Sequence, residues 1–174
     1  ISMPAYTIAV LPGDGIGPEV VAEALKVLLA LEKPFPKLRL IFSEHPVGAH
    51  CYTETGTDLP RSTLDACRQA DAILFGSAGD PDIRFPDGTE IAPQLTLRFV
   101  LDLYAGIRPI KKYPGISPLL SGDPPIDYVI MRENTEGLYA SRGAGVRVGD
   151  DVAVDNMVIT RRGTERIVRY AFEI

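Results

Sequence analysis

The sequence predicts an α/β protein built on a parallel-type sheet flanked by helices. Short apolar runs alternate with longer segments whose apolar residues recur at helical spacing. The resulting order of strand, helix, strand, helix, strand is typical of βαβ units. Of the 174 residues, 45% are hydrophobic and 24% are charged, which is the composition of a globular chain and not of a disordered or fibrous one.

The first half of the chain contains the clearest elements. Three apolar runs bounded by turn residues predict buried strands at residues 6–11, 38–43 and 72–75. Two segments with helical spacing lie between them, at residues 18–31 and 60–70. Pro18 stands in a first helical turn, where proline is favoured, and Pro34 ends the first helix.

The second half is less regular. Residues 79–88 are rich in turn formers, residues 95–104 have helical spacing, and two apolar runs predict strands at residues 107–110 and 126–131. The valine-rich, glycine-punctuated stretch of residues 138–160 predicts the two arms of an extended hairpin. Thr164 is the expected N-cap of a final helix that starts at Glu165. Because the chain ends inside this helix, we expect it to be truncated.

Charge and cysteine content narrow the classes of function. The net charge of −5, from 18 basic and 23 acidic residues, argues against nucleic-acid binding, although a local arginine cluster can still bind a small anion. Cys51 and Cys67 are too few for a disulfide framework, so buried thiols in a reducing compartment are expected. Residues 1–5 lack the positive segment of a signal peptide and no apolar run near the start could span a membrane. The cytoplasm is therefore the expected location, with no membrane partner.

A glycine-rich turn, Gly-Asp-Gly-Ile-Gly-Pro-Glu at residues 13–19, lies between the first strand and the first helix. Glycine-rich turns in this context often bind phosphate. The dinucleotide fingerprint requires glycine at its sixth position, however, and Pro18 stands there. A Rossmann-type reductase is thus disfavoured, and a plain strand-to-helix turn remains an open reading of the glycines alone.

Three arginines and one tyrosine form the main candidate site. Arg98 lies on an expected helix, Arg108 and Arg132 lie at or near strand ends, and Tyr139 follows in the same region. Element ends often converge on one cleft, and planar guanidinium groups bind carboxylates through paired hydrogen bonds, so three arginines suit a di- or tricarboxylate.

Each of these residues also has an ordinary structural interpretation. A surface arginine is commonly solvated or held in a weak salt bridge, for which Asp102 and Glu133 are nearby candidates in the sequence. A tyrosine commonly packs with its hydroxyl hydrogen-bonded. The residue types alone leave both interpretations open.

Taken together, these segments resemble the β-decarboxylating dehydrogenases, the isopropylmalate/isocitrate/tartrate dehydrogenase family. The resemblance runs from Tyr6 to Glu173, and it covers only the N-terminal half of such a protein. The glycine-rich turn resembles the opening of the family. Residues 76–81 resemble its loop near the nicotinamide, and residues 158–161 and 165–173 resemble the segment that enters the second domain's helix.

The resemblance implies an isopropylmalate dehydrogenase-like fold, truncated, with a partial second α/β domain and an extended hairpin arm. Residues 1–104 would be the N-terminal part of a first, cofactor-side domain, and residues 105–174 the N-terminal part of a second domain for substrate and dimerisation. The arm at residues 138–160 would join two subunits of a homodimer, although an ordinary surface hairpin is the alternative.

The activity implied is NAD(P)-dependent oxidative decarboxylation of a 3-substituted malate with Mg²⁺ or Mn²⁺, as in leucine biosynthesis. The resemblance assigns the substrate carboxylates to Arg98, Arg108 and Arg132 and the proton donor to Tyr139. It assigns the cofactor to Gly15, Ile16, Gly76, Ser77, Ala78 and Gly79. The family's lysine, metal-binding aspartates and adenine-binding loop match positions beyond Ile174. No residue here is therefore assigned to a metal, Asp80 and Asp82 are ascribed to a turn, and the 174 residues alone are expected to be inactive.

The substrate is the least defined feature. Ala92 and Gln94 replace the serine and asparagine of the isocitrate enzymes, which disfavours isocitrate. Ile91 replaces the acid typical of isopropylmalate enzymes, and residues 134–137 are closer to the isocitrate, homoisocitrate and tartrate branches. We favour 3-isopropylmalate with NAD, and NADP remains possible. The alternatives are a tartrate- or malate-type substrate, then homoisocitrate or isocitrate, or a binding or assembly module that kept the fold.

Overall fold

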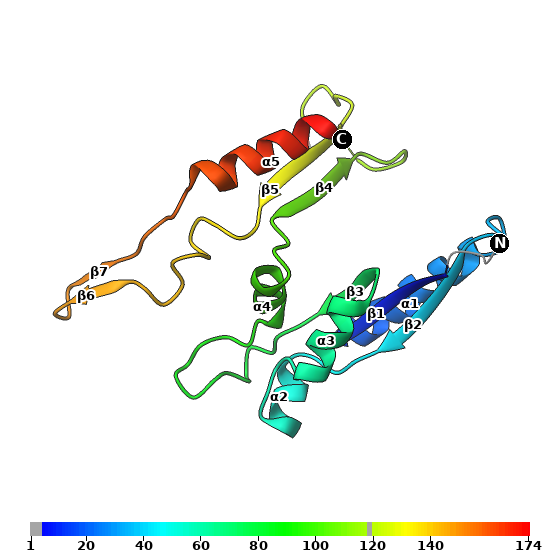
Figure 1. Ribbon diagram of the computed structural model, residues 1–174. Coiled ribbons are helices and arrows are strands. Elements are labelled where there is room, and N and C mark those ends of the chain that lie inside the picture. The colour runs from blue at the N-terminus through cyan, green and yellow to red at the C-terminus, as the bar shows by residue number, and fades with distance from the viewer. Residues whose placement is uncertain (1–4, 118–119) are drawn as a thin grey trace. The chain divides into compact units, whose positions relative to one another are not determined.

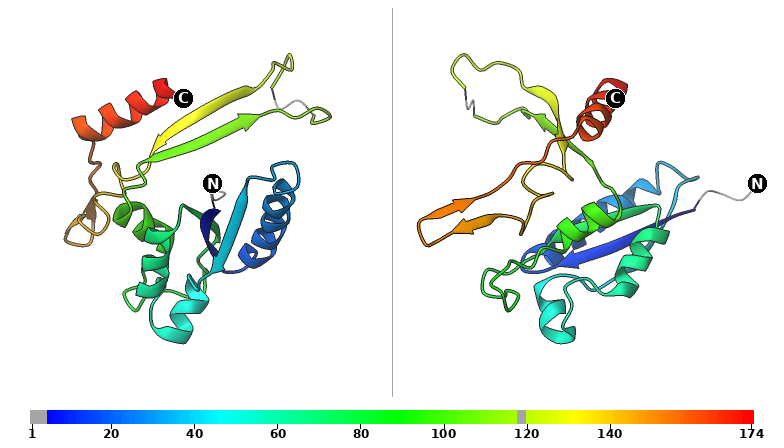
Figure 2. Two further views of the ribbon diagram at one scale, coloured as in Figure 1. Left: turned by 45° about the vertical axis from the view of Figure 1, so that its right-hand side comes forward. Right: turned by 60° about the vertical axis from the view of Figure 1, so that its left-hand side comes forward.

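The computed structural model describes residues 5–117 and 120–174 and divides into two compact units, Ile1–Leu97 and Arg98–Ile174 (Figures 1 and 2). The division falls inside the helix that carries Arg98. The expected domain boundary between residues 104 and 105 stays a prediction. Residues 1–4, on which the signal-peptide argument partly rests, lie outside the described part.

The first unit is built on a three-stranded parallel sheet of order β2-β1-β3. The strands are β1 (Ala5–Gly13), β2 (Arg39–Glu44) and β3 (Ala72–Ser77). Ile8 in the central strand pairs with Phe42 on one side and Ala72 on the other. Residues Ile8 to Leu11 are at most 8% exposed, and burial on both faces explains their continuous apolar run. The predicted α/β class with a parallel sheet is confirmed.

Four helices belong wholly or partly to this unit: α1 (Gly17–Leu31), α2 (Ala49–Thr55), α3 (Arg61–Gln69) and α4 (Pro93–Val100). Helix α1 packs against β1 and β3 (Figure 1). Its Val21 joins the buried cluster of Ile8 and Val10. Pro18 occupies its first turn, as predicted.

Helix α2 was not predicted from the sequence. It has only seven residues, too few to show a helical period. Gly48, with φ of 101°, precedes it, and Gly56, in the left-handed conformation, ends it. This pair of glycines was the available signal.

The second unit holds an antiparallel pair, β4 (Ala105–Lys111) and β5 (Asp127–Glu133), with α5 (Arg161–Glu173) packed on β5 (Figure 1). A second antiparallel pair, β6 (Val146–Val148) and β7 (Val152–Val154), forms the tip of the predicted hairpin arm. The arm is confirmed as a hairpin, although each of its strands is only three residues long.

The start of α5 differs from the prediction. Thr160, and not Thr164, is the N-cap: its hydroxyl accepts a hydrogen bond from the Gly163 backbone N–H at 3.0 Å. Thr164 lies inside the first turn and donates its hydroxyl proton to the Thr160 carbonyl at 2.9 Å. Both residues are threonines that precede a helical segment, so the cap preference could not separate them.

Other predictions of local structure hold. Asp80 accepts a hydrogen bond from the Asp82 backbone N–H at 2.9 Å, which accounts for this pair as a turn. Cys51 and Cys67 are free and buried, and burial raises the pKa of the Cys67 thiol. No helix in the described part of the chain is long and apolar enough to cross a membrane.

Candidate functional site

Tyr139 lies close to two of the three predicted arginines, Arg98 and Arg132. Its hydroxyl oxygen accepts a hydrogen bond from Arg132 Nη2 at 2.6 Å. The guanidinium carbons of Arg132 and Arg98 lie 5.3 and 5.9 Å from the centre of its ring. The hydrogen bond from Arg132, helped by the charges of both arginines against partial desolvation, lowers the pKa of the Tyr139 phenol. Because Arg132 occupies the oxygen, the phenolic hydrogen is free to be donated elsewhere.

Arg108 projects from the same face of the β4–β5 ribbon as Arg132. Gly106 pairs with Arg132 and Arg108 pairs with Ile130, and paired residues of an antiparallel ladder share a face. Side chains two residues apart along a strand also share a face, so Arg108 is the diagonal neighbour of Arg132. Arg108 is exposed, while Arg98 and Arg132 are half-buried. Residues that are far apart in sequence are therefore brought together as predicted.

Within residues 5–117 and 120–174, none of the three arginines forms an ion pair with a carboxylate. Asp102 and Glu133, which were candidate partners, both bind Arg166 of α5 instead. We call Arg98, Arg108, Arg132 and Tyr139 the arginine–tyrosine cluster. Its unneutralised positive charge and its paired N–H donors suit a ligand with carboxylate groups.

In the first unit, the glycine-rich turn is organised by Asp14. This side chain is 2% exposed, and its carboxylate accepts backbone hydrogen bonds from Ala49, His50 and Gly79 at 2.7, 2.9 and 2.8 Å. The Asp14 backbone N–H also donates to the Ser77 carbonyl at 2.6 Å. One carboxylate thus joins the turn, the start of α2 and the loop after β3.

The charge of Asp14 is maintained despite its burial. Desolvation alone would raise the pKa of the Asp14 carboxyl, but hydrogen bonds from the backbone of His50, Gly79 and Ala49 and from the His50 ring lower it below its ordinary value. The positive end of the α2 backbone dipoles acts in the same direction. In the sequence, Asp14 was noted only as part of the glycine-rich turn. The prediction missed that its carboxylate lies between the starts of two helices.

The glycines of this region serve backbone packing to different degrees. A Cβ atom at Gly17 or Gly76 would overlap the Pro12 carbonyl oxygen, whereas a Cβ at Gly15 would meet nothing within 4 Å. Ile16 is 60% exposed. Among the predicted cofactor contacts, Gly15 and Ile16 therefore present free surface, and Gly76 and Gly79 hold the loop against the turn.

A cavity of about 240 Å³ adjoins this loop. Its lining includes Ala78 and Gly79, which were predicted to contact the cofactor. It also includes Ile91, Ala92 and Gln94, the positions at which the substrate branches of the family differ. Ile91 is buried, and the Gln94 Oε1 atom is buried without a hydrogen-bond partner in the described part of the chain. The fold thus places the predicted cofactor contacts Ala78 and Gly79 and the substrate-discriminating positions around one cavity.

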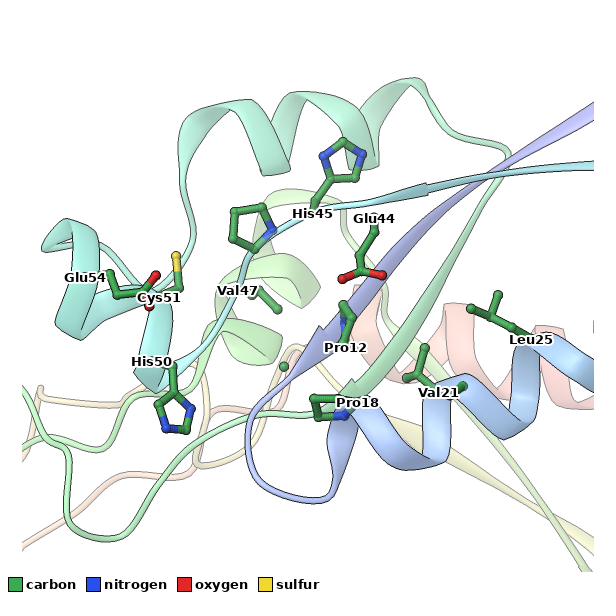
Figure 3. Close-up of a pocket in the computed structure, with 13 residues that line it drawn as sticks. Pro12, Pro18, Val21, Leu25, Glu44, His45, Val47, His50, Cys51 and Glu54 are labelled. Carbon is green, nitrogen blue, oxygen red and sulfur yellow. The ribbon is translucent and has the colours of Figure 1, made fainter.

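A larger cavity, of about 470 Å³, lies between α1, the end of β2 and α2 (Figure 3). Val21 and Leu25 extend from α1, Glu44 and His45 from the end of β2, and Glu54 from α2 (Figure 3). Its lining contains two glutamates and neither lysine nor arginine, so it does not suit an anionic substrate. The positive charge that suits an anionic ligand therefore lies at the arginine–tyrosine cluster and not in this cavity.

No group of three or more histidine, cysteine, aspartate or glutamate side chains that could hold a metal ion occurs among the described residues. Metal ligands thus remain unassigned in this chain. Arg166 is a second residue that sequence reasoning missed, since its partners lie 64 and 33 positions away along the chain.

Comparison with solved structures defines the class of fold. The isocitrate dehydrogenase of Methylococcus capsulatus superposes with a TM-score of 0.79 at 34% identity, covering 97% of this chain and 47% of that one. A β-decarboxylating dehydrogenase of Thermococcus kodakarensis gives a TM-score of 0.66 at 36% identity, covering 97% and 45%. The fold is that of the isocitrate/isopropylmalate-type dehydrogenases.

Sequence comparison gives the family. The model of the isocitrate/isopropylmalate dehydrogenase family matches residues 7–174, and the chain belongs to that family. A protein named 3-isopropylmalate dehydrogenase from Rhodococcus erythropolis is 47% identical over 169 residues, covering 96% of this chain and 49% of that relative. One of the same name from Thermobifida fusca is 46% identical over 170 residues, covering 95% and 47%. The chain spans about half the length of these relatives.

Proposed function

We propose that the protein to which this chain belongs oxidises and decarboxylates 3-isopropylmalate with NAD⁺ and Mg²⁺ or Mn²⁺. The observation that carries the proposal is the arginine–tyrosine cluster, in which Arg98 and Arg132 lie next to Tyr139 and have no carboxylate partner among the described residues. The names of the relatives support the choice of 3-isopropylmalate.

We assign a role in substrate binding or proton transfer to each residue of the arginine–tyrosine cluster. Arg132 and Arg98 bind the substrate carboxylates, and Arg108, on the same face as Arg132, extends the positive surface. This fixes the orientation of the carbon–carbon bond that breaks. Tyr139 donates its proton to the product carbon, and its lowered pKa makes it a stronger acid. Its oxygen stays hydrogen-bonded to Arg132, which stabilises the phenolate that results.

The first unit offers a surface for the nicotinamide cofactor. Gly15 leaves open space where a side chain would stand, Ile16 provides exposed apolar area, and Ser77 and Ala78 lie in the loop that Asp14 fastens to the turn. These residues fit contact with a planar ring. When bound, the nicotinamide supplies the hydride acceptor and the divalent ion supplies a Lewis acid. We assign no residue of this chain as a metal ligand.

The other substrates of the family remain the competing proposals. A tartrate- or malate-type substrate fits the same carboxylate contacts, and homoisocitrate or isocitrate would need a further polar contact where Ala92 stands. A binding or assembly module would not require unpaired arginines around a tyrosine. We also propose that the protein is a homodimer joined by the β6–β7 arm, whose four valines are 49–61% exposed.

Turnover by the full protein tests the proposal. NADH formation should be followed with Mn²⁺ and, in turn, 3-isopropylmalate, tartrate, malate, isocitrate and homoisocitrate. We expect the highest kcat/KM with 3-isopropylmalate, and a loss of about 100- to 10,000-fold in kcat for Tyr139→Phe. A higher kcat/KM with another of these acids would make that acid the proposed substrate. No turnover with any of them would overturn the proposal that the protein is an enzyme of this kind. The 174 residues alone are expected to give no NADH.

A further inference from the structure

Helix α4 ends in a turn whose key position is occupied by an unusual residue. The Leu103 N–H bonds to the Arg98 carbonyl at 2.8 Å and the Asp102 N–H bonds to the Phe99 carbonyl at 3.3 Å, which is the hydrogen-bond pattern of a Schellman motif. The left-handed residue of this motif is usually glycine. Here it is Asp102, with φ of 49°. A side chain at this position needs a compensating interaction.

Arg166 provides that interaction. Its Nη1 atom lies 2.9 Å from both carboxylate oxygens of Asp102, and its guanidinium carbon lies 4.3 Å from the centre of the Tyr104 ring. The side chain of Arg166 is 19% exposed. The turn that begins at Arg98 is therefore held by a half-buried arginine of α5.

The same guanidinium also holds the end of β5. Its Nη2 atom donates to Thr135 Oγ1 at 2.6 Å and lies 3.4 Å from Glu133 Oε1. Glu133 in turn accepts the Thr135 hydroxyl at 2.6 Å and the Thr135 backbone N–H at 2.8 Å. This loop joins Arg132 to Tyr139 along the chain. One side chain thus connects the two segments that carry the arginine–tyrosine cluster.

We propose that Arg166 is a positioning residue for substrate binding. It fixes the α4 turn that carries Arg98 to the β5 end that carries Arg132, and it binds the two nearby carboxylates, Asp102 and Glu133. The cluster therefore keeps its spacing around Tyr139, and its arginines remain available to the substrate carboxylates. This inference rests on the proposed function, because it assigns the cluster to a carboxylate substrate.

Asp102→Gly separates this role from a structural one. Glycine is the preferred residue at the left-handed position, so the substitution relieves the turn while it removes the partner of Arg166. In the full protein we expect an unchanged or higher thermal midpoint. The KM for 3-isopropylmalate should rise about tenfold with a smaller change in kcat.

Asp123→Gly is the matched control. Among the described residues, Asp102 and Asp123 are the two non-glycine residues with positive φ, and Asp123 is ion-paired with Lys112 in a turn of the same unit. The chemical change is therefore the same at both sites. We expect Asp123→Gly to leave KM within about twofold of the wild type. Equal KM values for Asp102→Gly and the wild type would overturn the proposal.

Arg166→Lys and Arg166→Gln test the guanidinium itself. Lysine keeps the positive charge but lacks the paired N–H donors. The KM of Arg166→Lys for 3-isopropylmalate should therefore lie between those of the wild type and Arg166→Gln. The Tyr139 pKa, followed by NMR of isotope-labelled tyrosine, gives a reading that needs no turnover. It should rise in Arg166→Gln as the cluster loosens. If the wild type turns over none of the acids, the proposed function fails, while an unchanged Tyr139 pKa in a folded Arg166→Gln variant would overturn the positioning role.

Discussion

Asp14 shows how one buried carboxylate organises three backbone segments. Its oxygens accept hydrogen bonds from backbone N–H groups at the start of α2 and in the loop after β3. The Gly48 position is packed so closely against the carboxylate that a Cβ there would overlap it. A charged acceptor between backbone donors is worth more than a neutral one, because each hydrogen bond is charge-assisted.

Asp14→Asn should lower the free energy of unfolding by about 2–4 kcal/mol near neutral pH, because an amide N–H₂ group would then face backbone donors. Folding lowers the Asp14 pKa, so its contribution is present above the unfolded value of about 3.9 and is lost as the pH falls through the folded value. Urea unfolding of both proteins should therefore converge in acid. Asp65→Asn, at a side chain that is 44% exposed, should change stability by less than about 1 kcal/mol. An equal effect of Asp14→Asn and Asp65→Asn would contradict the role of Asp14.

The acidity of Tyr139 depends on Arg132. Arg132→Gln removes the hydrogen-bonded charge, so the phenol pKa should rise towards its ordinary value of about 10. A pH titration of labelled tyrosine, assigned with Tyr139→Phe, measures this. Arg61→Gln, at a side chain of α3 that is 93% exposed, is the control and should leave the Tyr139 pKa unchanged. No rise in Arg132→Gln would mean that another group sets the acidity.

At the scale of elements, the glycine-rich turn and the caps of the helices decide where each element begins. The turn between β1 and α1 lies so close to Ser77 and Pro12 that a side chain would clash at two of its positions, Gly13 and Gly17. Helix α5 begins at a threonine whose hydroxyl caps the backbone, and Glu136 accepts the Thr160 backbone N–H at 2.8 Å.

Gly17→Ala and Gly15→Ala separate packing from open surface within the turn. A methyl group at Gly17 would overlap the Pro12 carbonyl, so we expect a loss of more than about 3 kcal/mol in the free energy of unfolding. Gly15 has φ of 54° and open space, so its variant should lose only about 1–2 kcal/mol from backbone strain. Chemical denaturation compares them. The reverse order of stability would be inconsistent with the packing of this turn.

Thr160→Ala and Thr164→Ala identify the cap of α5. Loss of the Thr160 hydroxyl removes the bond to the Gly163 N–H and should cost about 1 kcal/mol. The Thr164 hydroxyl donates to the carbonyl of the cap residue Thr160 and caps no backbone N–H, so its loss should cost less than about 0.5 kcal/mol. Thermal unfolding measures both. A larger effect at Thr164 would restore the cap position that the sequence suggested.

At the scale of the whole molecule, the sequence predicted the elements that bury continuous apolar runs. Strands β1 and β3 were predicted from their continuous apolar runs, and helix α1 was predicted from the helical spacing of its apolar residues. Helix α2 and the start of α5 were not, because glycines and a hydroxyl define them and no period does.

The candidate site divides in the same way. The convergence of Arg98, Arg132 and Tyr139 could be predicted from their places at element ends and from the family resemblance. The partners of Asp102 and Glu133 could not, because Arg166 lies far along the chain and surface charges carry no periodic signal. Long-range polar contacts of this kind need the tertiary structure.

Binding of 3-isopropylmalate to the full protein, measured by titration calorimetry with Mg²⁺ present, tests the central claim most directly. If the arginine–tyrosine cluster holds the substrate carboxylates, Arg132→Gln should weaken binding by about 10- to 100-fold, as expected for the loss of charged hydrogen bonds. Arg61→Gln, at an exposed position of α3, should bind as the wild type does. Equal affinities of the wild type and a folded Arg132→Gln variant would contradict the assignment of this cluster to the substrate.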